Sequence, residues 1–290
     1  MRVLVLGVTG MLGHASYRVF GESAQLEVWG TLRADESRRY FSQADQARLV
    51  SGVDVLDEDL LAGTLERIAP DVVVNCVGLI KQMPGTDDPL VALPINAMLP
   101  HRLARQCASR GARVVHISTD CVFSGRKGMY SESDASDAED LYGRSKYIGE
   151  LGNHSNAITL RTSMIGHELN SKHSLVEWFL SQTGRIHGYT RAIFSGLPTV
   201  ELARLVRDRV LPRADLHGVY HVSAKPISKF ALLNLIAEAY GKKIEISPDA
   251  SVVIDRSLDS SRFSNATGYV APEWPELIQS MHRDWTTAHV

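Results

Sequence analysis

Cysteine, long apolar runs and blocks of like charge are all scarce in this chain of 290 residues, and each shortage excludes a class of protein. The three cysteines (Cys76, Cys107 and Cys121) are an odd number without metal-ligand spacing, so we expect no disulfide framework and a reducing, cytoplasmic setting. No stretch approaches the roughly 20 apolar residues that a membrane span needs, and no signal-peptide pattern is present. The net charge is -2 without a basic run, so nucleic acid is not an expected partner.

The 11 histidines also lack a metal-binding pattern, because they are not tightly spaced and no His-Glu-x-x-His motif occurs. We therefore expect no catalytic metal. What the chain does have is an ordinary globular composition, with 44% hydrophobic and 22% charged residues. Its length suffices for one large core and a smaller lobe.

A glycine-rich turn follows directly on the first apolar segment. Residues 2–6 are typical of a buried parallel strand, Gly7, Gly10 and Gly13 follow at regular spacing, and a helix is expected over residues 14–20. Glycines let a backbone approach a pyrophosphate, and the start of a helix offers free amides to it. The spacing differs from the usual fingerprint G-x-G-x-x-G. An ordinary strand-to-helix turn is the alternative, but the context favours nucleotide binding.

Apolar strands alternate with helical segments through the first half of the chain. This alternation predicts an α/β fold of the Rossmann type, a doubly wound parallel sheet with helices on both faces. We expect strands at 26–32, within 51–56, at 70–78 and at 113–118, and helices at 60–68 and 96–110. After Leu160 the pattern loosens, with helices expected at 176–182, 200–210 and 229–240 and short strands at 244–248 and 251–255.

Two domains are expected from this change of pattern. Residues 1–160 should form the nucleotide-binding domain and carry the catalytic residues. Residues 161–290 should form mostly a smaller carboxy-terminal substrate-binding lobe, from which some segments return to the main sheet.

Tyr142 and Lys146 lie four residues apart, so a helix would place both side chains on one face. A lysine ammonium favours the phenolate form of a nearby tyrosine, which can then exchange a proton closer to neutral pH. Ser118 or Thr119, at the end of a predicted strand, supplies a hydroxyl for the same substrate oxygen. The alternative is an exposed aromatic–cation pair, because the spacing alone is common.

These motifs together resemble the extended short-chain dehydrogenase/reductases. The three glycines, Tyr142-x-x-x-Lys146 and the run Ser118-Thr-Asp-Cys-Val-Phe-Ser-Gly125 are similar to those of the dTDP-4-dehydrorhamnose reductase branch, and the resemblance covers nearly the whole chain. It implies that Thr119 is the catalytic hydroxyl, Tyr142 the acid/base, and Lys146 its electrostatic partner and a ribose ligand. Thr119 is expected rather than Ser118, because alternate residues of a strand face opposite sides and the family uses the threonine.

The resemblance also implies the residues around a nicotinamide dinucleotide. They are Gly7, Thr9, Gly10, Met11, Leu12, Gly13, Arg33, Asp54, Val55, Cys76, Val77, Gly78, Tyr142 and Lys146. The second predicted strand runs into Arg33 with no acid before Asp35, and arginine can bind a 2′-phosphate. We therefore expect NADP(H), with NAD(H) and a solvated Arg33 as the alternative.

Members of this family act on nucleotide-linked 4-keto-6-deoxy sugars, which fits a role in bacterial surface-polysaccharide biosynthesis. The expected substrate contacts are Lys81, Gln82, Thr119, Asp120, Arg256 and Arg262. Arginine suits a diphosphate, although Arg256 and Arg262 serve equally well as surface ion-pair partners. Two departures, the loop after Asn75 and Cys121 in place of the usual tyrosine, favour a related keto sugar over dTDP-4-dehydrorhamnose itself.

The sequence leaves three functions open. The first is an NADP(H)-dependent nucleotide-sugar ketoreductase in which Tyr142 donates the proton. The second is a nucleotide-sugar epimerase or 4,6-dehydratase that keeps its cofactor; a dehydratase is disfavoured, because Asp120 supplies one acid where a pair is usual. The third is a non-catalytic NADP-binding regulatory subunit, although such proteins often lose the tyrosine or lysine that this chain has. We also expect a homodimer that pairs through the Tyr142 helix and the helix before it.

Overall fold

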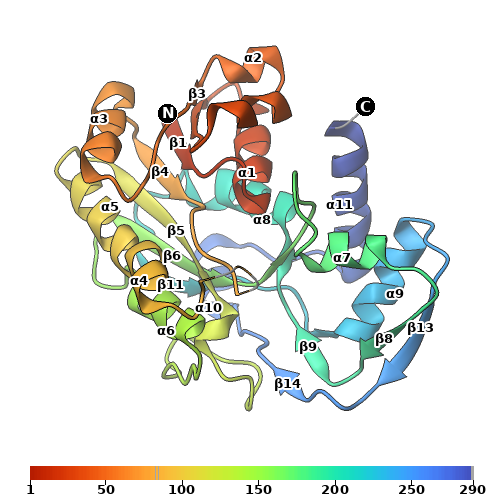
Figure 1. Ribbon diagram of the computed structural model, residues 1–290. Coiled ribbons are helices and arrows are strands. Elements are labelled where there is room, and N and C mark those ends of the chain that lie inside the picture. The colour runs from red at the N-terminus through yellow and green to blue at the C-terminus, as the bar shows by residue number, and fades with distance from the viewer. Residues whose placement is uncertain (82, 84, 289–290) are drawn as a thin grey trace. The chain divides into compact units, whose positions relative to one another are not determined.

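The computed structural model describes residues 1–81, 83 and 85–288. The chain divides into two units, each built from three separate stretches of sequence (Figure 1). Unit 1 comprises Met1–Ser118, Glu139–Leu160 and Ala203–Val219. Unit 2 comprises Thr119–Ala138, Arg161–Leu202 and the chain from Tyr220 onward.

A seven-stranded sheet has the strand order β11-β6-β5-β4-β1-β2-β3. Its strands are β1 (Arg2–Leu6), β2 (Glu27–Thr31), β3 (Leu49–Val50), β4 (Val72–Asn75), β5 (Arg113–Thr119), β6 (Ala157–Thr162) and β11 (Gly218–His221). The pairs β1–β2, β1–β4, β2–β3 and β4–β5 are parallel. The predicted Rossmann-type α/β fold is confirmed, because a parallel sheet of this order is the core of that fold.

Helices cover both faces of this sheet because its strands are apolar on both sides. Leu4 and Leu6 of β1 belong to a buried cluster that also contains Leu65 of α3 (Glu58–Ile68) and Leu103 of α5 (Leu99–Ala108). On the other face, α1 (Met11–Gly21) lies against β2, where a Cβ added at Gly30 would meet the Tyr17 ring at 3.1 Å. Alternation of side chains along each strand separates the two layers.

The remaining elements of unit 1 are short. They are the 3-10 helix η1 (Asp35–Tyr40), α2 (Gln43–Gln46), α4 (Pro89–Ala92), the π-helical turn η2 (Leu93–Met98), α6 (Leu141–Ile148) and a second π turn η4 (Val206–Val210). The helix expected over 96–110 thus begins only at Leu99, after the π turn.

The third strand was expected within 51–56, and that prediction is wrong, because β3 is Leu49–Val50. Gly52 has a φ of +74°, which turns the chain out of the sheet immediately after Ser51. The amide of Val53 then donates to the carbonyl of Leu32 at 3.1 Å, so this apolar segment joins the end of β2 as a turn.

Unit 2 is organised around three small sheets. Their strand orders are β10-β7, β12-β9-β14 and β13-β8. The strands are β7 (Met164–Ile165), β8 (Arg185–Tyr189), β9 (Ala192–Phe194), β10 (Leu197–Pro198), β12 (Ile227–Ser228), β13 (Glu245–Asp249) and β14 (Ile254–Asp255). The helices are η3 (Asp120–Val122), α7 (Leu175–Ser181), α8 (Thr199–Leu205), which runs on into unit 1, α9 (Lys229–Ala239), α10 (Ser261–Thr267) and α11 (Trp274–Ala288).

None of the helices that the structure describes combines the length and the apolar character needed to cross a membrane.

Candidate functional site

The glycine turn after β1 forms a cradle in which two glycines, Gly7 and Gly13, leave no room for a side chain. Gly7 has a φ of +78°, and a Cβ added there would lie 2.8 Å from Cγ2 of Val77. A Cβ added at Gly13 would lie 2.1 Å from the carbonyl oxygen of Gly7. The first turn of α1 therefore packs directly on the strand end, and no described side chain caps it. Its free amides and the positive end of the helix dipole suit a pyrophosphate.

The other predicted cofactor residues of unit 1 border the ends of neighbouring strands. Arg33 follows β2, is exposed, and makes no hydrogen bond or ion pair within the described part of the chain. Asp54 is exposed and accepts a hydrogen bond from the amide of Leu56 at 3.0 Å, while Val55 packs against the buried cluster. Burial raises the pKa of the Cys76 thiol to about 12, so this cysteine stays protonated and unreactive. Among the described residues at these strand ends, Arg33 is thus a cation without a hydrogen-bond or ion-pair partner, and it follows the strand where the adenosine half of the cofactor is expected.

Arg33→Ala is expected to weaken NADPH binding by about 10- to 100-fold and NADH binding by less than about 2-fold. A charge-assisted hydrogen bond to a phosphate contributes about 1.5–3 kcal/mol, and only NADPH carries the 2′-phosphate. Fluorescence titration of both cofactors measures the two Kd values. Arg39→Ala is the matched control, because Arg39 is exposed nearby and contacts Tyr40. Equal losses for the two cofactors in Arg33→Ala would contradict the assignment.

Helix α6 carries both Tyr142 and Lys146, as the sequence predicts. Asp140 caps its start by accepting the amide of Gly143 at 2.7 Å. Gly149 ends it against the π turn η2, where a Cβ would lie 2.0 Å from the carbonyl oxygen of Asn96. Tyr142 is half-buried and Lys146 is buried, so the two side chains of the predicted pair differ in their access to solvent.

The ammonium group of Lys146 donates to the carbonyl oxygen of Ile117 on β5 at 2.8 Å. A Cβ added at Gly78 would lie 3.8 Å from Lys146 Nζ, so the lysine reaches the segment that follows β4. Burial lowers the pKa of Lys146 to about 8, and the Glu150 carboxylate partly opposes this shift. With a pKa of about 8 the lysine still carries its proton at pH 7, and an ammonium group is what favours the phenolate form of a nearby tyrosine.

Lys146→Met is expected to stabilise the protein by about 2–3 kcal/mol at pH 7, since a buried ammonium with a depressed pKa costs folding free energy. The pKa is about 8 in the folded chain against 10.5 ordinarily, so the full cost applies below pH 8. Between pH 8 and about 10.5 the folded lysine loses its proton before the unfolded one, so the wild type gains stability and the difference shrinks. Urea unfolding at pH 7 and pH 10 measures this, with the exposed Lys172→Met as control; a pH-independent difference would contradict the shift.

Two buried asparagines that the sequence did not single out hold the segment after β4. Asn75 accepts the amide of Val77 at 3.1 Å, and its side-chain nitrogen lies 3.2 Å from Nδ1 of His116. Asn96 accepts the amide of Leu79 at 3.0 Å and donates to Ser145 Oγ on α6 at 3.2 Å. Together they fix Val77 and Gly78 relative to α6. A sequence signal exists for Asn96, a polar residue within an apolar helical stretch.

Ser118 and Thr119 end β5 with different partners. Ser118 Oγ donates to Glu150 at 2.8 Å within unit 1. Thr119 belongs to unit 2, where its hydroxyl accepts the amide of Cys121 and donates to Asp120. Burial raises the pKa of Asp120, an effect that the charge of Arg256 partly offsets. The assignment of Thr119 to a common site with Tyr142 stays a prediction.

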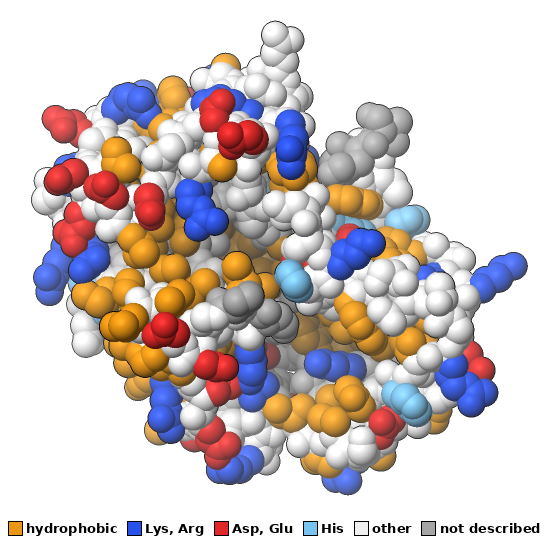
Figure 2. All heavy atoms as spheres, viewed as in Figure 1, with side chains coloured by type: hydrophobic (Ala, Val, Ile, Leu, Met, Phe, Trp, Pro, Cys, Tyr) orange, Lys and Arg blue, Asp and Glu red, His pale blue; other side chains and the backbone are white. Residues whose placement is uncertain are grey.

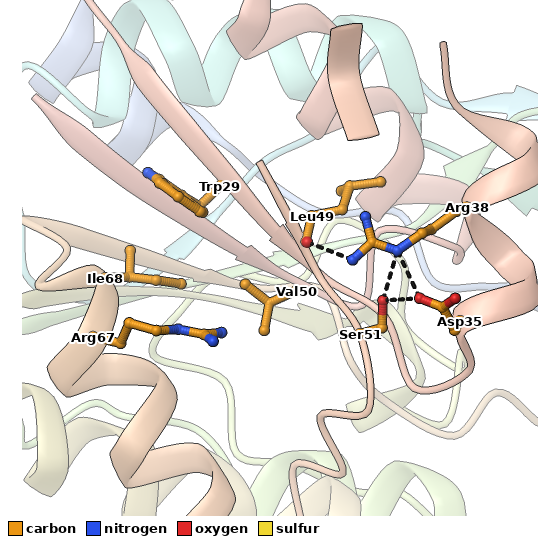
Figure 3. A pocket seen from close by; sticks show the side chains of 8 residues that line it. All are labelled: Trp29, Asp35, Arg38, Leu49, Val50, Ser51, Arg67 and Ile68. Atoms are coloured by element: carbon orange, nitrogen blue, oxygen red, sulfur yellow. Dashed lines mark hydrogen bonds and ion pairs between the residues drawn. The ribbon is translucent and has the colours of Figure 1, made fainter. Parts of the chain in front are cut away.

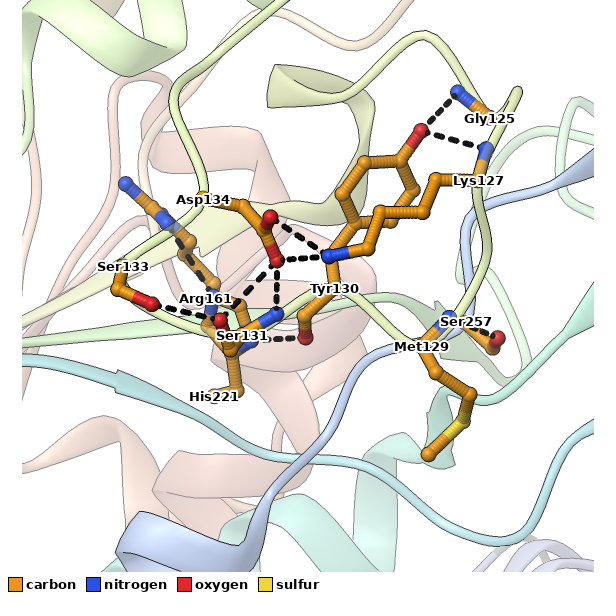
Figure 4. A network of polar contacts seen from close by, with 10 residues as sticks. All are labelled: Gly125, Lys127, Met129, Tyr130, Ser131, Ser133, Asp134, Arg161, His221 and Ser257. Atoms are coloured by element: carbon orange, nitrogen blue, oxygen red, sulfur yellow. Dashed lines mark hydrogen bonds and ion pairs between the residues drawn. The ribbon is translucent and has the colours of Figure 1, made fainter.

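Unit 2 gathers its polar residues into a network that includes Arg161 and His221 (Figure 4). Arg161 Nη1 lies 3.2 Å from Nε2 of His221, and the His221 Nδ1 lies 2.9 Å from the carbonyl oxygen of Tyr130. Burial lowers the pKa of His221 to about 4, so its ring is neutral. The Tyr130 hydroxyl accepts the amides of Gly125 and Lys127 at 3.1 Å, which folds this loop back on itself. The network supports the loop that follows Thr119.

The predicted substrate residues fall into two groups. Lys81 of unit 1 forms a 2.5 Å ion pair with Asp140, the cap of α6, and Gln82 lies outside the described residues. In unit 2, Arg256 donates to the carbonyl oxygen of Phe123 at 2.7 Å, whereas Arg262 is exposed and lies over the Tyr220 ring at 4.5 Å. Within the described residues, no three His, Cys, Asp or Glu side chains form a group able to hold a metal ion.

Unit 1 also exposes a set of apolar side chains. Figure 2 shows hydrophobic side chains gathered on its face over α4 and α6. The exposed large side chains of these elements and of the adjoining π turn are Leu90, Val91, Met98, Tyr147 and Ile148. Exposed apolar patches commonly mark sites of protein association, and the expected homodimer stays a prediction.

Comparison with known proteins gives one family. The family model described as RmlD substrate binding domain matches residues 1–286. Methionine adenosyltransferase 2 subunit beta of Danio rerio is 29% identical over 253 residues, which is 82% of this chain and 74% of that protein. The dTDP-4-dehydrorhamnose reductase of Mycolicibacterium smegmatis is 30% identical over 167 residues, 57% of this chain and 47% of that protein.

Solved structures share the fold. A dTDP-4-dehydrorhamnose reductase from Clostridium acetobutylicum superposes with a TM-score of 0.81 at 21% identity, covering 99% of this chain and 100% of that one. The dTDP-4-dehydrorhamnose reductase of Bacillus anthracis in complex with NADP has a TM-score of 0.78 at 21% identity, covering 98% and 99% of the two chains. At this identity the likeness concerns the fold alone.

Proposed function

Because the chain belongs to the RmlD substrate binding domain family, within the extended short-chain dehydrogenase/reductases, we propose that it binds NADP(H) in the cradle of unit 1. The amides that follow Gly10 suit the pyrophosphate, Arg33 the 2′-phosphate, and Lys146 the ribose next to the nicotinamide. A bound nicotinamide would supply or accept hydride. Two observations support this: Gly13 packs closely on Gly7, and no described side chain caps the first turn of α1.

The curated relatives favour a role as a cofactor-binding, non-catalytic subunit of a larger enzyme. The alignment with a methionine adenosyltransferase subunit spans 82% of this chain, whereas the alignment with a reductase spans 57%. The apolar face that contains Leu90 and Ile148 supports association, because a protein partner would remove that surface from water. The proposed partner is accordingly a methionine adenosyltransferase catalytic chain, and NADP(H) would serve that complex as a bound ligand.

A second function, reduction of a nucleotide-linked 4-keto-6-deoxy sugar, is favoured by the side chains of α6. Tyr142 would hold a proton on its phenol oxygen and pass it to the ketone oxygen of the sugar. Lys146, with its pKa near 8, would stabilise the phenolate that remains. Thr119 would donate a hydrogen bond to the same oxygen as charge develops there. A non-catalytic chain has no need of this set.

One series of measurements separates the two functions. NADPH and NADH are first titrated against the protein; next, the absorbance at 340 nm is followed with a panel of nucleotide-linked 4-keto-6-deoxy sugars; finally, gel filtration tests for a complex with a methionine adenosyltransferase catalytic chain. A complex without NADPH oxidation supports the subunit function. Oxidation that depends on one sugar supports the reductase, and failure to bind either cofactor overturns both proposals.

A further inference from the structure

Asp35, the first acidic residue after β2, accepts hydrogen bonds from two neighbouring side chains. Arg38 Nε donates to Asp35 Oδ1 at 2.7 Å, and Ser51 Oγ donates to the same oxygen at 2.5 Å. Figure 3 shows the three side chains pointing toward one another. Hydrogen bonds from Ser51 and then from Arg38 lower the pKa of Asp35, so the carboxylate is charged at neutral pH. Because Ser51 lies directly after β3, this contact joins the loop after β2 to the end of the next strand.

Arg38 is itself fixed by the backbone. Its guanidinium donates to the carbonyl oxygens of Gln46 and Leu49, each at 2.9 Å, and its side chain is 29% exposed. Four acceptors therefore hold Arg38 in place, if the bond to Ser51 is included. Arg33, five positions earlier, is exposed and makes no such contacts among the described residues. The two arginines thus have separate roles, one structural and one available to a ligand.

In dinucleotide-binding folds, an acid after the second strand accepts the 2′-hydroxyl of NAD, and its negative charge disfavours a 2′-phosphate. We propose that Arg38 and Ser51 make this chain selective for NADP(H) by withholding Asp35, a carboxylate that would otherwise serve NAD(H). This rests on the proposed binding of NADP(H) in unit 1. The Asp35 side chain is 73% exposed, but Arg38 pairs with its charge and Ser51 anchors its Oδ1, so Arg33 acts on the 2′-phosphate beside a carboxylate whose charge is already paired.

The test compares Arg38→Met with Arg39→Met. These neighbours on η1 differ in their contacts, because Arg39 donates to the Tyr40 hydroxyl and lies near the charge of Glu36, whereas Arg38 binds Asp35 and two backbone carbonyls. The Arg38 and Ser51 side chains line an open cavity of about 520 Å³, which gives the methionine room, so the substitution changes charge more than packing. We expect Arg38→Met to bind NADH more tightly and NADPH more weakly than the wild type does. The ratio of the two Kd values should change by at least about 10-fold, the effect of one charge-assisted hydrogen bond. Arg39→Met should leave the ratio unchanged.

Asp35→Ala assigns the effect to the carboxylate. In the wild-type background it should leave the ratio of Kd values within about 2-fold, because Asp35 is withheld there. In the Arg38→Met background it should cancel the gain for NADH. A ratio that stays at the wild-type value in Arg38→Met, or that changes in the same way with and without Asp35, overturns the proposal.

Ser51→Ala is the second variant, to be used if Arg38→Met destabilises the protein so far that NADPH and NADH cannot be titrated. It removes the 2.5 Å bond to Asp35 and leaves the backbone contacts of Arg38 in place. A shift toward NADH supports the proposal, and an unchanged ratio overturns it. Two failures can be told apart. If the wild-type protein binds neither cofactor, the proposed function itself fails. If it binds NADPH and these variants do not alter that binding, only the proposal about Asp35 fails.

Discussion

Gly13→Ala is expected to weaken NADP(H) binding by more than about 100-fold. The new Cβ would lie 2.1 Å from the carbonyl oxygen of Gly7 and 2.8 Å from its carbonyl carbon, distances that no side chain can occupy without a backbone shift. The shift displaces the first turn of α1 from β1, and a displacement of about 1 Å is enough to spoil several amide contacts to a pyrophosphate. Titration of NADPH by fluorescence gives the Kd, and thermal melting reports the accompanying loss of stability.

Gly21→Ala is the matched control for this prediction. Gly21 is the last residue of the same helix, and an added Cβ there meets no atom within 4 Å. The same substitution should therefore leave NADPH affinity unchanged and the melting temperature equal or slightly higher, because alanine favours the helix by up to about 1 kcal/mol. Wild-type affinity in Gly13→Ala would show that the cradle is not the cofactor site.

If the second proposed function holds, Tyr142→Phe is expected to lower the rate of sugar-dependent NADPH oxidation by about 10²- to 10⁴-fold, the usual contribution of a general acid. The substitution removes one oxygen from a half-buried ring and keeps the rest of the side chain, so the Kd for NADPH should change by less than about 2-fold. Stopped-flow absorbance at 340 nm under single-turnover conditions measures the chemical step. Loss of cofactor binding together with turnover would assign the tyrosine a structural role instead.

Tyr147→Phe on the same helix provides the comparison. Tyr147 is exposed, so loss of its hydroxyl should leave both turnover and cofactor affinity unchanged. If the protein forms a complex with a methionine adenosyltransferase catalytic chain and oxidises no sugar, Tyr142→Phe should leave formation of the complex unchanged, because no proton transfer takes place there.

Periodicity along the chain predicts the sheet well, because its central strands are buried on both faces. The expected strands at 26–32 and 70–78 contain β2 and β4, and the one at 113–118 covers all of β5 except its last residue. The helix expected at 60–68 matches α3 closely. The third strand fails, since the apolar residues Val53 and Val55 serve a turn and the buried cluster rather than the sheet. In unit 2 most of the strands have two or three residues, too few to show a period.

The candidate site is predictable where its residues are neighbours in sequence. The glycine turn and the pair Tyr142 and Lys146 are local motifs whose spacing has a physical reason. The contacts that hold them are long-range: Lys81 meets Asp140 across 59 positions, and Asn96 meets Ser145 across 49. A single sequence does not indicate which distant polar residues will meet, so these partners emerge only from the folded chain.

Strand β11 has a consequence for biosynthesis. It lies at the edge of the seven-stranded sheet beside β6, yet the ribosome makes it only after two stretches of unit 2, Thr119–Ala138 and Arg161–Leu202, have been synthesised. Until then β6 presents an open edge, with unpaired backbone groups that can recruit strands from other nascent chains. A fragment cut at residue 160 would keep that open edge permanently, so the cofactor cradle is better isolated from the full chain than from its amino-terminal half.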